Sequence, residues 1–212
     1  MLELITIIFF LLIIRILSKK NYFELNKNMK IYRVKDDIYL IDDFYKYPNK
    51  IRNMYINKRF KNHISIYTTK YFNPRLYDSS EHIEFFSKLM KTIITRKLWN
   101  DNVKKNSNGY IQYMTKDSMP VLHTDTVANF GTVIYLGDND HPDYGTSFYK
   151  HKDTGLEIIP SDAEFEKLSE EKKRLYENYY KNHYWAEGEK PKFDKWEKIY
   201  TAKNKFNSAV VF

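Results

Sequence analysis

The hydrophobic pattern of the chain begins with one long apolar run. Residues 4–14, LITIIFFLLII, are apolar except for one threonine, and the run reaches residue 17 if Arg15 places its charge at a membrane interface. We interpret residues 1–17 as an N-terminal membrane anchor, although a spanning helix usually has about 20 apolar residues. A cleaved signal peptide and a buried core helix are the alternatives for this run. Residues 18–30 are polar and form a predicted linker.

The charges that flank the apolar run set its expected orientation. Glu3 precedes it, with no lysine or arginine beside it, and no small-residue cleavage site follows, which is not the pattern of a signal peptide. Arg15, Lys19 and Lys20 lie on its C-terminal side. Because cytoplasmic flanks of membrane helices are rich in lysine and arginine, we expect a single-pass anchor with the folded domain on the cytoplasmic side.

Periodic patterns predict one mixed domain over residues 31–212. Residues 31–45 alternate around two aspartates, which favours either two strands joined by a tight turn or one strand followed by a loop. Residues 47–60 and 79–98 have apolar side chains at three- to four-residue spacing, so we predict a helix in each. A third, highly charged helix is predicted over residues 160–184, as a surface insertion between strands.

Short strand patterns fill the rest of the C-terminal half. They are GYIQYMT (109–115), VLHTD (121–125), FGTVIYLG (130–137), GTSFYKH (145–151), WEKIYTA (196–202) and FNSAVVF (206–212). Early helices, many late strands and no alternation of strand and helix favour an α+β fold. We expect an antiparallel sandwich or open barrel with supporting helices on one face.

Composition and charge narrow the function classes. The 212 residues are 42% hydrophobic, enough for one domain with a substantial core. The chain has no cysteine, which excludes disulfides, zinc knuckles, iron–sulfur clusters and thiol catalysis. The net charge of +8 is spread without a basic block or a nucleic-acid motif, so it does not favour a nucleic-acid partner.

Two pairs of histidine and aspartate could carry metal chemistry. Residues two apart on a strand project to the same face, so His123-Thr-Asp125 or His151-Lys-Asp153 could offer an imidazole and a carboxylate to one ion. Threonine and glycine follow Asp153, which favours a turn there. The first pair lies between two apolar strands, where a buried carboxylate needs a partner or a metal. We therefore prefer His123 and Asp125 as candidate ligands.

The strand order around this pair resembles the first half of a known fold. A strand with Tyr113 precedes the pair, Thr132-Val-Ile-Tyr-Leu follows it, and Gly145-Thr-Ser-Phe-Tyr comes next. This run is similar to the double-stranded β-helix, a jelly-roll or cupin-like fold, of the Fe(II)/2-oxoglutarate-dependent dioxygenases, in particular their prolyl-4-hydroxylase-like branch. The segments IYLIDDFYKYPNKIRNMYI and FNSAVVF resemble the opening and the penultimate motif of a small family in that branch. The resemblance covers residues 31–212.

The resemblance implies a set of site residues. His123 and Asp125 would be catalytic and would be two of three iron ligands, and the hydroxyls of Tyr113 and Tyr135 would contact the carboxylates of 2-oxoglutarate. Fe(II) and 2-oxoglutarate are the implied cofactors, with ascorbate as an accessory. The implied reaction is hydroxylation of a peptide or a small molecule, and the sequence does not select the substrate. Both tyrosines can also be read as core aromatic residues.

The resemblance also shows what this sequence lacks. In the family a second histidine ligand comes just after the strand that matches residues 207–212, and an arginine or lysine that pairs with 2-oxoglutarate comes later. The histidines further along this chain, His141, His151 and His183, do not lie in the matching place. We therefore expect this chain to be inactive or weakly metal-binding, and the sequence to be cut short of the active enzyme. The alternatives are a catalytically inactive, membrane-associated binding module on the same fold and a structural protein with an accidental pair.

Overall fold

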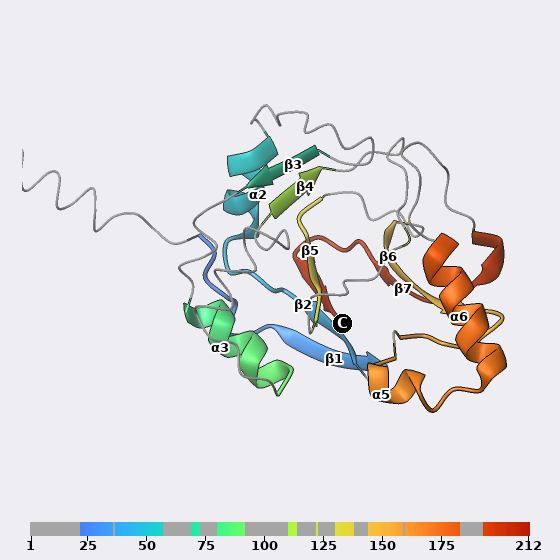
Figure 1. Cartoon of the computed structure of the whole chain (residues 1–212). Helices are drawn as coiled ribbons and strands as arrows, with labels where there is room; N and C mark the ends of the chain where they lie inside the picture. Colours follow the sequence, from blue (N-terminus) through green and yellow to red (C-terminus); the bar gives the residue numbers. More distant parts are fainter. Residues whose placement is uncertain are drawn as a thin grey trace, which may run out of the picture.

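A computed structural model describes ten segments of the chain (Figure 1). They are residues 22–35, 37–56, 69–72, 80–91, 110–113, 122, 130–137, 144–158, 160–182 and 193–212. Their strands are β1 (Lys30–Lys35), β2 (Ile38–Asp42), β3 (Thr69–Phe72), β4 (Tyr110–Tyr113), β5 (Thr132–Tyr135), β6 (Gly145–His151), β7 (Trp196–Lys203) and β8 (Ser208–Val211). Their helices are α2 (Pro48–Ile56), α3 (Ser80–Leu89), α5 (Asp162–Phe165), α6 (Glu170–Asn182) and the 3-10 helix η2 (Phe193–Lys195).

Every strand pair in the described residues is antiparallel, which confirms the α+β class. One sheet has the order β1-β2-β8-β5, and β3–β4 and β6–β7 form two further pairs. The β1–β2 pair confirms the hairpin, the first of the two alternatives for residues 31–45. Along the chain, β5 and β8 pair with each other while β6 and β7, which lie between them in sequence, pair in a different sheet. The strands from β5 to β8 therefore form one long hairpin that is divided between two sheets.

The main core lies between the four-stranded sheet and the helices α2 and α3. Alternate residues of β8 face opposite sides of the sheet, so Ala209 and Val211 pack toward the helices while Val210 packs on the other face. Ile51 and Tyr55 of α2 are buried there, as the helical spacing predicts. This arrangement places helices on one face of the sheet and leaves the other face for β6–β7.

Residues 22–29 pack against this core, although the sequence pattern assigns them to a linker. Phe23 and Leu25 are buried. Leu25 forms an isolated bridge with Tyr45. The Asn26 N–H donates to the Phe44 carbonyl at 2.9 Å. Two apolar residues spaced two apart thus bury one side of this segment, and the polar residues around them conceal that pattern.

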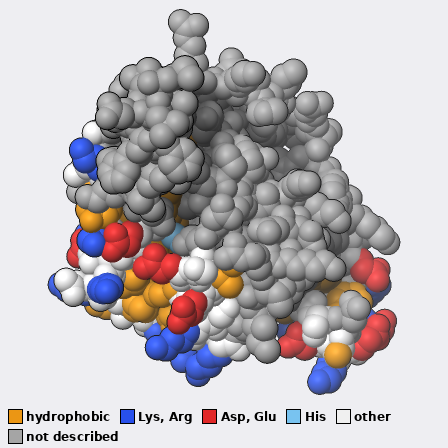
Figure 2. Space-filling model, turned by 90° about the vertical axis from the view of Figure 1, so that its left-hand side faces the viewer, with side chains coloured by type: hydrophobic (Ala, Val, Ile, Leu, Met, Phe, Trp, Pro, Cys, Tyr) orange, Lys and Arg blue, Asp and Glu red, His pale blue; other side chains and the backbone are white. Residues whose placement is uncertain are grey.

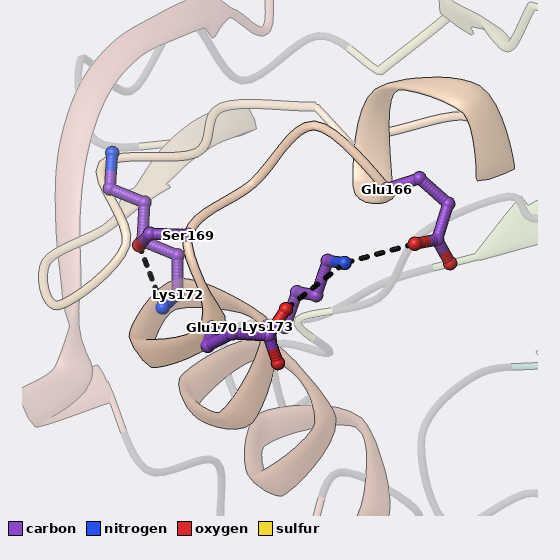
Figure 3. Close-up of polar contacts among 5 residues, drawn as sticks. All are labelled: Glu166, Ser169, Glu170, Lys172 and Lys173. Carbon is purple, nitrogen blue, oxygen red and sulfur yellow. Dashed lines mark hydrogen bonds and ion pairs between the residues drawn. The ribbon is translucent and has the colours of Figure 1, made fainter.

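The charged helix predicted over residues 160–184 is two helices, α5 and α6. The Glu164 carboxylate accepts hydrogen bonds from the N–H and hydroxyl of Ser161, which hold its pKa below the usual range. A second start follows at Ser169, whose hydroxyl accepts from the Lys172 N–H at 3.3 Å (Figure 3). Figure 3 also shows Lys173 of α6 reaching Glu166 across the break, at 2.9 Å. The second cap divides the segment because it offers the chain another place to begin a helix.

The two other predicted helices are described in part. Helix α3 ends at Leu89, and Lys91 after it has a φ of 49°, which closes the helix with a left-handed residue. Residues 92–98 and 57–60 of the predicted helices lie outside the described residues. From residue 22 onward, the described parts of the chain contain no helix long and apolar enough to cross a bilayer. Residues 1–17, the predicted anchor, lie outside them.

Asn207 joins three segments at the start of β8. Its N–H donates to the Tyr135 carbonyl and its carbonyl accepts from the Phe44 N–H, both at 2.8 Å. Its side chain pairs with the main chain of Tyr45, accepting from the N–H and donating to the carbonyl, each at 2.9 Å. The residue is 6% exposed and has a φ of 59°, a conformation that asparagine adopts more readily than most residues. The side-chain amide of Asn207 therefore makes the two hydrogen bonds to the Tyr45 main chain that a neighbouring strand would otherwise make.

Removing the Asn207 amide should destabilise the whole domain. Asn207→Ala leaves two buried main-chain groups of Tyr45 without partners, so we expect the free energy of unfolding to fall by about 2–5 kcal/mol in urea titrations. Asn207→Gly should lose about 1 kcal/mol less, because glycine tolerates the positive φ. Asp43, which is exposed and has a φ of 57°, is the control. Asp43→Ala should lower the free energy of unfolding only by the small cost of placing alanine at a positive φ. Equal losses in Asn207→Ala and Asp43→Ala would contradict the role of the amide.

His82 is a titratable residue inside the main core. It is 3% exposed on α3, and its ring lies 5.7 Å from that of Tyr45 and 6.2 Å from that of Phe44, measured between centroids. Burial lowers the pKa of His82 to about 4, so the ring is neutral at pH 7. It shares the buried face of α3 with Phe86, one turn further along.

The buried ring predicts a pH dependence of stability. The unfolded state binds the proton near pH 6.5 and the folded state only near pH 4, so the free energy of unfolding falls as the pH drops through that window. We expect a loss of roughly 3 kcal/mol between pH 6.5 and pH 4 from this residue. Urea titrations at several pH values should show a shallower decline for His82→Gln than for the unsubstituted chain. Parallel curves would contradict the assignment.

Candidate functional site

The candidate site is the hydrophobic cluster between the four-stranded sheet and the β6–β7 pair, which lies beside β5 in Figure 1. Residues from both sheets pack into one cluster there. Its buried members are Ile38, Tyr135, Ala202 and Val210, and its partly buried members are Leu40, Phe148, Tyr200 and Phe212. The Phe148 ring meets the edge of the Phe212 ring with centroids 5.2 Å apart. The cluster between the two sheets is therefore apolar and aromatic.

Tyr135 crosses this cluster from β5 to the second sheet. It is 9% exposed, and its hydroxyl donates to Thr146 Oγ1 at 2.6 Å and lies 3.3 Å from the Ala202 carbonyl oxygen. Burial raises the pKa of Tyr135 above its ordinary value, so the hydroxyl keeps its proton. Because both acceptors belong to β6–β7, the hydroxyl fixes the spacing of the two sheets at this point.

Gly145 lets β6 approach β7 closely enough for this contact. Its φ is 145°, and a Cβ there would lie 1.9 Å from the Ala202 carbonyl oxygen. No side chain fits at that distance without moving the backbone. The Gly145-Thr146 pair thus has two linked roles: the glycine permits the close approach of β6 to β7, and the threonine hydroxyl accepts the hydrogen bond from Tyr135.

The structure describes the side chain of one of the four predicted site residues. His123 and Asp125 lie outside the described residues. Tyr113 ends β4, where its backbone pairs with Thr69, and its side chain also lies outside them. Tyr135 is buried and faces the second sheet, which agrees with its reading as a core aromatic and also places it in the candidate site.

The second pair, His151 and Asp153, has separate hydrogen-bond and ion-pair partners. His151 is 6% exposed, with Nδ1 2.9 Å from Thr154 Oγ1 and its ring 5.1 Å from the Trp196 ring. Asp153 instead reaches Lys195, at 3.6 Å on the surface. Burial lowers the pKa of His151. The pair therefore closes the end of β6 in a turn, as the threonine and glycine after Asp153 predict.

The described residues contain no group of three or more histidines, aspartates and glutamates that could hold a metal ion. His141 and His183 lie outside them, as do the two preferred candidate ligands. On the face shown in Figure 2, the described lysines and arginines alternate with acidic and hydrophobic side chains.

Sequence reasoning missed Thr146 and Asn207 as residues that build this site. Thr146 is the second residue of β6 and contacts Tyr135 of the preceding strand, whereas Asn207 comes just before β8 and contacts Tyr45 after β2. The signals that could have found them are the Gly-Thr pair at the start of β6 and the asparagine in the turn before β8. Each marks a place where a side chain meets backbone or hydroxyl groups of another element.

The fold defines an α+β protein with a hairpin divided between two antiparallel sheets. The chain belongs to a family whose function is unknown, described as "Family of unknown function (DUF6445)", whose model matches residues 26–212. No curated protein and no solved structure matches the chain at a significant level. The match covers all the described strands, so the family shares the region that contains the candidate site.

The contact between Tyr135 and Thr146 should be measurable as a coupling between the two sheets. We expect Tyr135→Phe and Thr146→Val to be non-additive in urea unfolding, with a coupling energy of about 1 kcal/mol. Ser147 and Thr201, whose hydroxyl oxygens lie 3.0 Å apart within the β6–β7 pair, are the control because they join no second sheet. Additive losses at Tyr135 and Thr146 would show that the hydroxyl does not hold the sheets together.

Proposed function

We propose that this chain has the double-stranded β-helix fold and is a membrane-tethered Fe(II)/2-oxoglutarate dioxygenase-like protein, of a class that hydroxylates peptides or small molecules. Because no second histidine ligand lies in the matching place, we expect this chain to be inactive or to bind the metal weakly. The observation that carries the proposal is the division of the β5–β8 hairpin between two sheets. A long hairpin folded across two sheets is how jelly rolls are wound. The strands involved are also the segments of the sequence that resemble the dioxygenases, namely β5, β6 and β8.

The proposed metal ligands are His123 and Asp125. They lie in the segment just before β5, and residues two apart on a strand share a face. An imidazole and a carboxylate together suit ferrous iron, which keeps open positions for further ligands in sites of this kind. With 2-oxoglutarate and dioxygen, bound iron would supply the oxidation of a C–H bond.

The described residues would form the surroundings of such a centre. The apolar side chains of Phe148, Val210 and Phe212 would keep water away from an oxidising group held beside this cluster. Thr146 accepts a hydrogen bond from Tyr135, so its own proton remains available to a ligand oxygen. The Tyr135 hydroxyl would have to turn from Thr146 to donate to a 2-oxoglutarate carboxylate. We therefore propose Thr146 beside Tyr113 and Tyr135 as a ligand contact.

The proposal keeps residues 1–17 as a single-pass anchor with the domain on the cytoplasmic side. The apolar run and the lysines and arginine after it support this placement. The folded chain begins close behind it, since Phe23 and Leu25 are already buried. Any substrate would thus be met near a membrane.

The matched pair Asp125→Ala and Asp153→Ala tests the metal site. Mn²⁺, which has the ligand preference of ferrous iron without its redox chemistry, can be titrated into the full chain in detergent and followed by electron paramagnetic resonance. We expect Asp125→Ala to weaken binding at least about tenfold, with or without 2-oxoglutarate, because it removes a direct ligand. Asp153→Ala should change it little, since Asp153 pairs with Lys195 on the surface.

The control for folding is the far-ultraviolet circular dichroism of both variants, which should match that of the unsubstituted chain. Binding that is equal in the two variants would refute a metal site at Asp125. The chain would then be a catalytically inactive binding or structural module on the same fold.

A further inference from the structure

Strand β1 carries an exposed apolar surface at the edge of the four-stranded sheet. All six of its residues are exposed, and Ile31, Tyr32 and Val34 retain 46%, 46% and 39% of their accessible surface. Within the described residues, β1 pairs with β2 and no strand pairs with its other edge. Tyr32 and Val34 share one face of the strand and Ile31 lies on the other, so exposed apolar side chains flank the open edge of β1 on both faces.

Basic side chains surround these apolar side chains. Lys30 and Arg33 lie on β1 itself, which has no acidic residue, and Lys27 is exposed in the turn before it. At the far end of the strand, Lys35 already pairs with Glu157. Lys27 and Lys30 lie toward the N-terminal end of β1, and Arg33 lies between Tyr32 and Val34. Such a combination is complementary to a surface that is both apolar and anionic.

The length of chain before the described residues favours a bilayer as that surface. If the anchor ends at residue 17, five residue steps lead to Tyr22, and an extended chain spans at most about 18 Å over them. Phe23 and Leu25 are buried, so the domain is held from that point on. Strand β1 begins eight residues after Tyr22. The tether therefore keeps the segment that leads into β1 near the membrane.

We propose that β1 and the turn before it form a contact surface for an anionic membrane. Ile31, Tyr32 and Val34 would enter the headgroup region, where tyrosine is favoured at membrane interfaces, and the lysines and arginine would meet anionic lipids. The free strand edge stays hydrated at that depth, so its main-chain groups need no protein partner. This inference rests on the proposed anchor. A contact of this kind would set the orientation of the cluster between the two sheets relative to the bilayer.

An exposed edge strand can also receive an added peptide strand, and lysines on an edge can serve to prevent such pairing. Neither reading explains why the apolar and basic residues gather at the end of the chain that leads to the anchor. The peptide reading also predicts that β1 is covered by protein without lipid. The two can be separated by one labelling experiment.

The chain has no cysteine, so a single introduced one gives a unique labelling site. Tyr32→Cys and, as the control, Lys198→Cys on the exposed side of β7 can each carry a nitroxide in the full chain. The labelled chains are inserted into vesicles of phosphatidylcholine alone or rich in phosphatidylserine. Accessibility of the label to an aqueous nickel chelate and to dissolved oxygen reports its depth.

With phosphatidylserine, we expect the label at position 32 to be several-fold less accessible to the nickel chelate than the label at 198. The double substitution Lys30→Glu and Arg33→Glu should remove this difference. Equal accessibility at both positions in chains that float with vesicles overturns the contact and leaves the anchor standing. Chains that do not float overturn both. Protection of position 32 that is equal in both lipids overturns the anionic contact. Protection that is already present in detergent also overturns it, and identifies a protein partner instead.

Discussion

The Asn207 side chain is the interaction on which the described architecture depends. It pairs with both main-chain groups of Tyr45, while its own main chain bonds to Phe44 and Tyr135. One residue thus holds the turn after β2, the end of β5 and the start of β8. Because β8 is the inner strand between β2 and β5, a displaced turn there would separate the N-terminal hairpin from the rest of the sheet.

The cluster between the sheets depends on that arrangement. With β5 held beside β8, Tyr135 projects from the face opposite the helices and reaches Thr146 and the Ala202 carbonyl. Gly145 allows β6 and β7 to lie close enough for this contact. The result is a packed apolar cluster with the Tyr135–Thr146 hydroxyl pair between the two sheets.

The elements were predictable where a single face is buried. The alternation in residues 31–45 predicted the β1–β2 hairpin, and the spacing of Ile51 and Tyr55 predicted α2. Periodicity failed where polar residues carry the structure. It assigned residues 22–29 to a linker because two buried side chains are too few to form a pattern. It also merged α5 and α6, because a second helix cap at Ser169 leaves the helical spacing almost unchanged.

The candidate site was less accessible to sequence reasoning than the fold. Tyr135 was found through a resemblance, and the structure adds the hydroxyl contact that a strand pattern cannot contain. His82 was missed because a histidine on a helix is counted as polar, although aromatic neighbours bury it. The two His-x-Asp pairs were distinguished by the residues on their C-terminal sides, and the turn geometry of the His151 pair bears out that half of the reasoning.

The central proposal is that His123 and Asp125 bind a metal ion beside the hydrophobic cluster between the two sheets. Amide resonances of the full chain, recorded during additions of Mn²⁺, test it most directly, because the paramagnetic ion broadens nearby signals selectively. The account predicts early broadening of the Thr146 and Ala202 amides, which is absent in Asp125→Ala. Broadening centred on Asp153 and Lys195, or spread evenly over the surface carboxylates, would contradict it.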